Sequence, residues 1–198
     1  MGLKALIQKI RWAPSNFFNR IKMHLRHVKY GKCFMSHGMI VFRGRGNVSF
    51  GNNVVINSSL VSNPIGGSTK SIFYSKDRAI IQVGNNVGIS NSAFVALNQI
   101  IIEDEVLIGG NCKIYDHDFH SLDYKTRILP GNQGVIGKPI LIKRGAFIGG
   151  HSIILKGVTI GEKSIVGAGS VVTKSIPDGE LWAGNPARYI YTISENEE

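Results

Sequence analysis

The fold is decided by residues 142–177, which read IKRGAFIGGHSIILKGVTIGEKSIVGAGSVVTKSIP. An aliphatic β-branched residue returns there every six positions without a break: Ile142, Ile148, Ile154, Ile160, Val166 and Val172. A second residue, usually small, follows each of them by four positions: Ala146, Ser152, Val158, Ser164, Ser170 and Ile176. Neither the helical period of 3.6 nor the strand period of two produces a repeat of six. The period indicates short strands joined by tight turns, stacked coil upon coil as a solenoid.

Weaker copies carry the repeat toward the N-terminus. They occur at Ile102, Ile108 and Ile114, at Val83, Ile89 and Val95, and more faintly near Phe50 and Ile56. Glycine makes up 24 of the 198 residues, which suits a chain that turns often and tightly. We therefore expect an all-β chain of roughly six coils with three strands in each. A β-sandwich with accidental spacing is the alternative.

The repeat lapses after Ile114 and resumes near Ile140, so a loop of residues 115–138 interrupts the solenoid. This loop begins YDHDFHSLD, which places two histidines and three aspartates within eight residues. Insertions in solenoids lie on one face, and that face commonly carries function. Imidazole is suited to removing a proton from a hydroxyl near neutral pH, and a neighbouring carboxylate can orient it. The loop is therefore the expected place of chemistry.

The C-terminal part of the chain resembles a known family. The repeat followed by VVTK at 171–174, Pro177 and AGNPAR at 183–188 resembles the hexapeptide-repeat O-acetyltransferases, in particular the maltose/galactoside and polysaccharide branch. The resemblance covers about residues 48–193. It implies a left-handed parallel β-helix, usually a homotrimer. It also implies transfer of an acetyl group from acetyl-CoA to a hydroxyl of a sugar or surface-polysaccharide precursor, without a metal.

The resemblance implies a direct transfer in which His120 is the general base, because Asp118-Phe119-His120-Ser121 fits the family context best. Asp118 is the expected carboxylate partner. The backbone N–H of Gly150 would stabilise the oxyanion of the intermediate. His117 is read as a loop or substrate-contacting residue. The family's acid from the N-terminal region is missing, because no acid precedes Asp77; the orienting carboxylate is therefore Asp116, Asp118, Asp123 or an acid from elsewhere.

Further site residues follow from the matching positions. The resemblance implies that coenzyme A is bound by Phe147, Gly150, Ala168, Thr173, Lys174, Asn185 and Arg188. It implies that the acceptor contacts Ser90, Asn91, Asp116 and His117. The alternative for Lys174 and Arg188 is that they are solvated surface charges without a role in binding. An amino sugar or a hydroxylated antibiotic is the alternative acceptor. A metal-dependent lyase of the γ-carbonic-anhydrase type, enlisting His117, His120 and His151, and an inactive scaffold are the rival functions.

The net charge of +10 is concentrated at one end, because residues 1–76 contain twelve Lys or Arg and no acid. Residues 1–30 are expected to form basic amphipathic helices, the first ended by Pro14 and the second capped by Ser15. The apolar face of the second includes Phe17, Phe18, Ile21, Leu25 and Val28. It would bind an anionic membrane surface or pack on the solenoid or a neighbouring subunit. Nucleic acid is another common partner of a basic segment, but the sequence has no nucleic-acid-binding motif, so we do not expect this partner.

The sequence also predicts the bounds of the solenoid domain and the cellular location of the chain. We expect the solenoid domain to span residues 31–193, followed by an acidic tail at 194–198. No stretch approaches the ~18 apolar residues of a spanning helix, and Lys4, Lys9 and Arg11 interrupt any signal-peptide core. The chain is therefore expected in the cytoplasm, with peripheral association on the inner membrane face as an option. Cys33 and Cys112 are too few for a disulfide framework and lack metal-ligand spacing.

Overall fold

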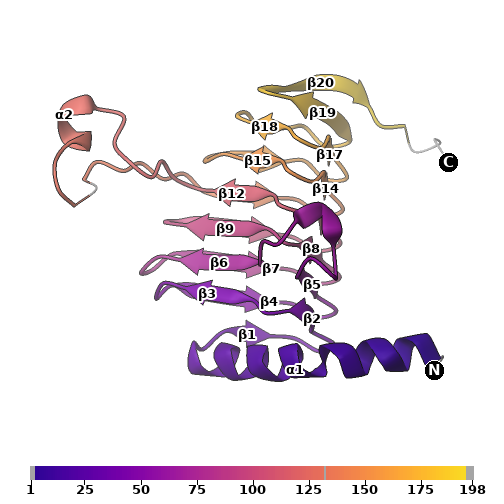
Figure 1. Ribbon diagram of the computed structural model, residues 1–198. Coiled ribbons are helices and arrows are strands. Elements are labelled where there is room, and N and C mark those ends of the chain that lie inside the picture. The colour runs from indigo at the N-terminus through magenta and orange to yellow at the C-terminus, as the bar shows by residue number, and fades with distance from the viewer. Residues whose placement is uncertain (1–2, 132, 195–198) are drawn as a thin grey trace.

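The computed structural model describes residues 3–131 and 133–194, and most of them form a column of stacked coils (Figure 1). Three parallel sheets run along the column, one strand of each per coil. Sheet A contains β1 (Lys29–Tyr30), β4 (Asn47–Phe50), β7 (Ile80–Val83), β10 (Gln99–Ile102), β13 (Ile140–Ile142) and β16 (Thr159–Ile160). Sheet C contains β3 (Val41–Arg43), β6 (Ile72–Ser75), β9 (Ala93–Ala96), β12 (Lys113–Tyr115), β15 (Ile153–Ile154) and β18 (Val171–Val172).

Sheet B is longer because a hairpin closes it. It contains β2 (Met35–Gly38), β5 (Val55–Ser58), β8 (Gly88–Ser90), β11 (Leu107–Ile108), β14 (Phe147–Ile148), β17 (Ile165–Val166), β19 (Glu180–Gly184) and β20 (Ala187–Thr192). β19 and β20 pair antiparallel, whereas every other strand pair is parallel. The AGNPAR segment lies in this hairpin, so the motif covers the C-terminal end of the column.

The repeat predicted the core correctly. All six aliphatic repeat residues between 142 and 172 are fully buried, and the six residues that follow them by four positions are at most 2% exposed. Larger side chains fill the N-terminal coils, where the rings of Phe73 and Phe94 stack with centroids 4.9 Å apart. The coils therefore share one continuous interior, and each coil covers the edge of the next.

The turns from sheet A to sheet B share one hydrogen-bonding pattern, in which a side-chain oxygen accepts from a backbone N–H of the neighbouring coil. The side-chain oxygen of Asn52 accepts from the N–H of Lys32, that of Asn85 from Asn52, and that of Asp104 from Asn85, at 2.6–2.9 Å. A glycine is needed before two of these residues. A Cβ on Gly51 would lie 2.8 Å from Asn85 Oδ1, and one on Gly84 would lie 2.4 Å from Asp104 Oδ1.

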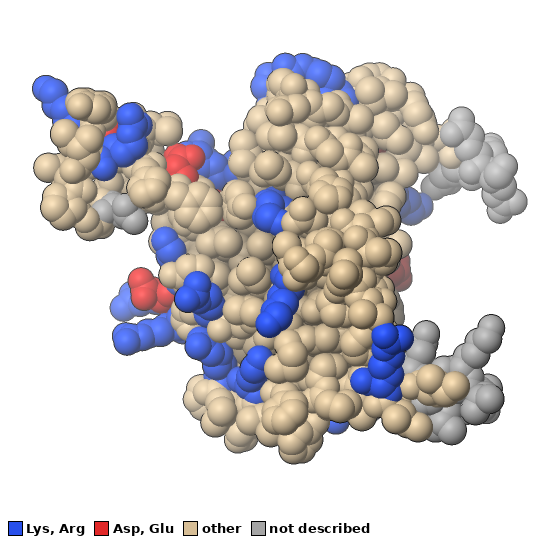
Figure 2. Space-filling model, viewed as in Figure 1, with Lys and Arg blue, Asp and Glu red and all other residues tan. Residues whose placement is uncertain are grey.

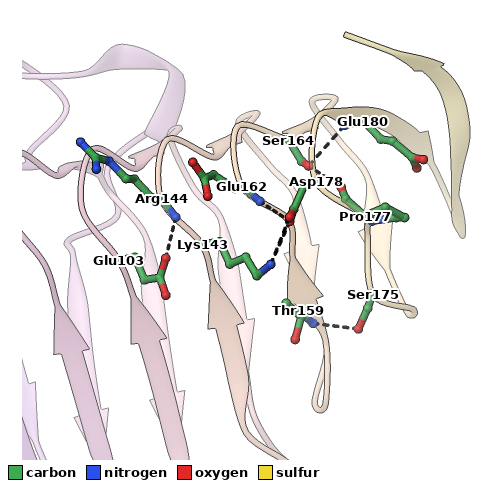
Figure 3. A network of polar contacts seen from close by, with 10 residues as sticks. All are labelled: Glu103, Lys143, Arg144, Thr159, Glu162, Ser164, Ser175, Pro177, Asp178 and Glu180. Atoms are coloured by element: carbon green, nitrogen blue, oxygen red, sulfur yellow. Dashed lines mark hydrogen bonds and ion pairs between the residues drawn. The ribbon is translucent and has the colours of Figure 1, made fainter.

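The last coils reuse this turn (Figure 3). Asp178 Oδ1 accepts from the N–H of Glu162 at 2.8 Å and pairs with Lys143 Nζ at 2.9 Å. The Lys143 ammonium lowers the pKa of Asp178. Ser164 Oγ donates to the carbonyl of Pro177 at 2.6 Å and so ties the final turn to the coil below it. Side chains thus link successive coils up to the C-terminal hairpin.

Helix α1 (Leu3–Leu25) covers the N-terminal end of the column (Figure 1). The expectation of two helices divided at Pro14 is wrong, because one helix runs through the proline. Ser15 does not cap a second helix; its Oγ donates to the carbonyls of Trp12 and Ser36. These bonds, with those of the neighbouring asparagines, hold the helix against the first coil after the proline, and before it the ring of Trp12 lies 5.3 Å from that of His37. No helix among the described residues is long and apolar enough to cross a membrane.

The solenoid begins with β1 at Lys29, close to the expected boundary at residue 31. One further feature was not predicted. A second excursion, residues 59–71, leaves the column between β5 and β6 and contains the short 3-10 helix η1 (Pro64–Gly66). The interrupting loop itself is present as predicted and carries α2 (Tyr124–Arg127) far from the column (Figure 1). Of the acidic tail, residues 195–198 lie outside the described residues.

Candidate active site

Asp116 is the buried centre of the loop's attachment point. It directly follows β12, where the chain leaves sheet C, and it is fully buried. One oxygen, Oδ1, accepts from the N–H of Leu97 at 2.7 Å and contacts His117 Nδ1 at 2.8 Å. The other, Oδ2, accepts from the N–H groups of Asn98 and Gln99 at 2.7 and 2.8 Å. The carboxylate is therefore held by four donors and fixes the position of the imidazole.

His117 has the arrangement of a general base. Because the Asp116 carboxylate accepts at Nδ1, that nitrogen carries a proton, and in the neutral form of the ring the lone pair lies at Nε2. The Nε2 atom is buried and has no hydrogen-bond partner among the described residues. The ring of Phe119, itself 44% exposed, lies over the imidazole with centroids 4.8 Å apart. A bridge between His117 and Gly137 closes the base of the loop.

The other acids of the loop have other contacts. Asp118, the expected partner of the base, forms an ion pair with Lys156 from the next coil. Asp123 caps α2 by accepting from the N–H of Thr126 at 2.7 Å, and this hydrogen bond lowers the pKa of Asp123. His120 lies on the exposed part of the loop, three residues beyond His117. Of the carboxylates that sequence reasoning left open, Asp116 contacts His117, with Oδ1 2.8 Å from Nδ1.

A second group of predicted residues surrounds the turn from sheet B to sheet C. Successive coils place Gly110, Gly150 and Ala168 in a column there, joined by hydrogen bonds from His151 N–H to Gly110 and from Gly169 N–H to Gly150. Asn91 is 1% exposed at the same turn, and its Oδ1 has no partner among the described residues. The expected acceptor residue Asn91 and the expected donor residue Gly150 therefore share one region.

The excursion at 59–71 contributes to this turn. A Cβ on Gly110 would lie 2.6 Å from the backbone nitrogen of Gly66, and one on Gly150 would lie 3.4 Å from Ile65 Cγ2. Ile65 is 63% exposed, so an apolar side chain stands beside the glycine column. Sequence reasoning missed this excursion, and the Pro-Ile-Gly-Gly run at 64–67 is the signal that could have indicated it.

Sheet B forms a shallow groove beside the same turn, lined by Asn57, Ser90, Leu107, Gly109 and Phe147, among others. Asn57 Nδ2 donates to Ser90 Oγ at 3.1 Å, and Asn57 Oδ1 contacts His37 Nδ1 at 2.9 Å. The expected acceptor residue Ser90 thus belongs to a polar ladder over three coils. Asn57 and His37 lie outside the stronger repeat copies, and sequence reasoning assigned them no role.

The predicted site residues therefore fall into two groups within one chain. Those at or beside sheet B are Ser90, Asn91, Phe147, Gly150, Ala168, Asn185 and Arg188; those at the end of sheet C where the loop departs are Asp116, His117, Asp118, His120, Thr173 and Lys174. Gly150 precedes β15 and Asp116 follows β12, the adjacent strand of sheet C. The loop histidines and Gly150 thus lie at opposite ends of sheet C. Within one chain the expected base and the expected oxyanion donor are therefore separated.

The two expected cations and His151 lie in different parts of the structure. Lys174 and Arg188 are both exposed, Lys174 just beyond β18 and Arg188 in β20 of the hairpin. His151 lies beside Asn111 at the turn from sheet B to sheet C, with Nδ1 3.2 Å from Asn111 Nδ2. Among the described residues no three His, Cys, Asp or Glu side chains are grouped as metal ligands would be.

The chain was compared with known families and solved structures. Residues 139–174 match the family "bacterial transferase hexapeptide (six repeats)", and residues 99–114 match the hexapeptide repeat of succinyl-transferase. A variant of AntD, an N-acyltransferase from Bacillus cereus, in complex with dTDP and coenzyme A is similar with a TM-score of 0.68 and 26% identity, over 84% of each chain. Another AntD variant, bound to dTDP-4-amino-4,6-dideoxyglucose and coenzyme A, has a TM-score of 0.65 and 26% identity, also over 84% of each chain.

A third similar structure is the hexapeptide-repeat acetyltransferase VCA0836 from Vibrio cholerae, with a TM-score of 0.57 and 27% identity over 91% of this chain and 82% of that one. The predicted fold class, a left-handed parallel β-helix, is confirmed by the three parallel sheets together with these similarities. The chain thus carries the repeats of the hexapeptide-repeat transferases on the fold that it shares with acyltransferases of that kind.

Proposed function

We propose that this protein transfers an acyl group from coenzyme A, in the first instance acetyl, to a hydroxyl group of a sugar or surface-polysaccharide precursor. The observation that carries the proposal is the Asp116–His117 pair at the root of the loop. The Nε2 atom of His117 is buried and has no hydrogen-bond partner within residues 3–131 and 133–194, while Nδ1 lies 2.8 Å from the fixed Asp116 carboxylate. A base held by an orienting group, with its second nitrogen available for a proton, is the arrangement that acyl transfer to a hydroxyl needs.

In the proposed reaction Nε2 of His117 takes the proton of the acceptor hydroxyl after the Phe119 ring has moved aside. The oxygen forms a bond to the thioester carbonyl carbon, which gives a tetrahedral oxyanion. The C–S bond then breaks, and the thiolate of coenzyme A receives the proton from the imidazolium. Asp116 stabilises the charged imidazolium in between. His120, favoured by the sequence context, is the second candidate for the base.

The donor is proposed to lie on the other group of residues. Coenzyme A carries phosphates, so exposed cations such as Arg188 and closely approachable backbone such as Gly150 suit it. Because Gly150 and His117 lie at opposite ends of sheet C, one copy would supply the donor site and the adjacent copy the base. A homotrimer of parallel columns would place these ends against each other.

A second candidate reaction is transfer to the amino group of a nucleotide-linked amino sugar. The similarity to AntD supports it, because AntD is an N-acyltransferase and one of its structures contains dTDP-4-amino-4,6-dideoxyglucose. Both reactions use the same donor. They differ in the bond that forms, an ester in one case and an amide in the other.

The experiment follows thiol release from acetyl-CoA with a panel of hydroxylated and amino sugars, free and nucleotide-linked. Products are then separated from acetyl-CoA and treated with alkaline hydroxylamine, which cleaves oxygen esters and leaves amides intact. We expect hydroxylamine-labile product from the wild-type protein. Amide product alone would establish the second candidate, and absence of turnover across the panel would contradict both.

Two histidine variants test the base. We expect His117→Gln to lower kcat by about 100-fold or more, the usual contribution of a general base, and His120→Gln to lower it by less than about tenfold. Thermal unfolding of both variants checks that the buried substitution leaves the chain folded. The reverse order of effects would assign the base to His120, and full activity in both variants would exclude a histidine base.

A further inference from the structure

Helix α1 is attached to the solenoid by its polar face. Asn19 is fully buried; its Nδ2 donates to Ser36 Oγ and to the carbonyl of Gly38, both at 2.9 Å, and its Oδ1 accepts from the N–H of Ile40 at 3.1 Å. Asn16 adds bonds in both directions to the backbone of Ser36, at 2.9 and 3.0 Å. These side chains satisfy backbone groups at the open edge of the first coil.

The opposite face of α1 is apolar and exposed. At 100° per residue its members fall within a sector of about 100°, roughly opposite Asn19. The exposed fractions are 56% for Ile7, 66% for Ile10, 61% for Phe17, 53% for Phe18, 42% for Ile21 and 72% for Leu25. We call these six residues the outer stripe. An aromatic-containing stripe of this size on the surface indicates a contact with something else.

The charge around the outer stripe is of one sign. Arg11 and Arg20 are exposed on its two sides, and no acid occurs in residues 1–76. The ion pairs formed by the described residues all lie beyond residue 100, so none neutralises these cations. Figure 2 shows Lys and Arg over the first coils and also on the lower edge, where α1 lies.

We infer that the outer stripe binds the surface of an anionic lipid bilayer. The apolar side chains would enter the boundary between headgroups and acyl chains, and the flanking cations would contact the lipid phosphates. The solenoid cannot cover the stripe, because the helix already faces the solenoid with its asparagines. A second copy is a poor occupant as well, since it would bring the same excess of positive charge to the contact.

The position of α1 suits this role. The helix lies across one end of the column, whereas neighbouring columns in a side-by-side assembly would meet along their sheets (Figure 1). All copies of such an assembly would present their outer stripes in one plane. Simultaneous attachment of several stripes strengthens binding without any new contact. The inference does not depend on the proposed acyl transfer.

Sedimentation of the full-length protein with vesicles tests it. The vesicles contain either phosphatidylcholine alone or phosphatidylcholine with a third of phosphatidylglycerol. We expect binding to the anionic vesicles at least about tenfold tighter than to the neutral ones, weakening as salt is raised. Phe17→Ala with Phe18→Ala should weaken it by about tenfold or more, and Arg11→Gln with Arg20→Gln by a similar factor.

Leu60→Ala with Val61→Ala is the matched control, because these residues are 53% and 62% exposed but lie outside α1. Binding of this variant should equal that of the wild type. The inference is overturned if the intact protein does not bind anionic vesicles, or if loss of both phenylalanines leaves binding unchanged. It is also overturned if the stripe variants instead abolish a concentration-dependent association of the protein with itself in the absence of lipid.

Discussion

At the scale of single residues, Asp116 connects the fold to the proposed chemistry. Its carboxylate accepts three backbone N–H groups from residues 97–99 and one from the imidazole of His117. The N–H groups belong to the turn that leads from β9 to β10 in the preceding coil. The residue that positions the proposed base is therefore also the residue that closes this turn.

Replacing Asp116 should affect stability and activity together. In Asp116→Asn an amide NH2 group would face backbone donors in a buried site, which costs about 2–4 kcal/mol of unfolding free energy. The imidazole would also lose the partner that fixes its tautomer, so kcat should fall by about 100-fold or more while KM for the acyl donor stays nearly constant. Thermal melting and steady-state kinetics below the melting temperature measure the two effects. A folded variant with unchanged kcat would show that Asp116 is structural only.

Sequence reasoning found the residues of this cluster but not their arrangement. The density of histidine and aspartate at 116–123 predicted the loop as the place of chemistry, since those residues are contiguous. It could not identify Asp116 as the acid that is fixed beside His117, because three of its donors lie about twenty residues earlier in the chain. Contacts between coils decide which carboxylate meets which histidine, and a single sequence does not reveal them.

At the scale of elements, the turn from sheet A to sheet B is the repeating unit that gives the solenoid its regularity. In this unit a residue with positive φ follows the Asn or Asp whose side chain accepts an N–H from the neighbouring coil, as at Asn53, Asn86 and Glu105. The repeat period therefore predicted the strands and their buried faces, because every coil obeys the same geometry. The path of α1 across Pro14 was not predictable in this way, since it depends on hydrogen bonds to the first coil.

The hydrogen bonds between Asn85 and Asp104 make part of the stability of the fold depend on pH. The N–H of Asn85, with its side chain, lowers the pKa of Asp104. A carboxyl with a lowered pKa in the folded state stabilises the fold above its ordinary value near 4, and the contribution disappears as the pH falls below that value. Between pH 7 and pH 3 the melting temperature of the wild type should therefore fall about 1–2 °C more than that of Asp104→Asn. An equal fall in melting temperature in the two proteins would show that the hydrogen bonds of Asp104 do not contribute to the loss of stability in acid.

At the scale of the whole molecule, the N-terminal end of the column is proposed to bind a membrane, and the region around the loop is proposed to carry out acyl transfer. The outer stripe lies at the N-terminal end, and the loop departs from the fourth coil, about 20 Å farther along at ~4.8 Å per coil. A column standing on a membrane would hold the loop at that height. An acceptor with its reacting hydroxyl on a glycan chain extending from the bilayer suits this distance better than one at the lipid surface.

The division of the site between two ends of sheet C can be tested by mixing inactive chains. His117→Gln removes the proposed base, and Ala168→Trp places a large side chain at an exposed position of the proposed donor site. If each site combines the base of one copy with the donor site of its neighbour, an equal mixture refolded together should regain about one quarter of wild-type activity. That is the fraction of junctions at which two intact halves meet. Each variant refolded alone serves as the control. A mixture no more active than the separate variants would mean that one chain contains the whole site, with the loop folded back along sheet C to reach its own glycine column.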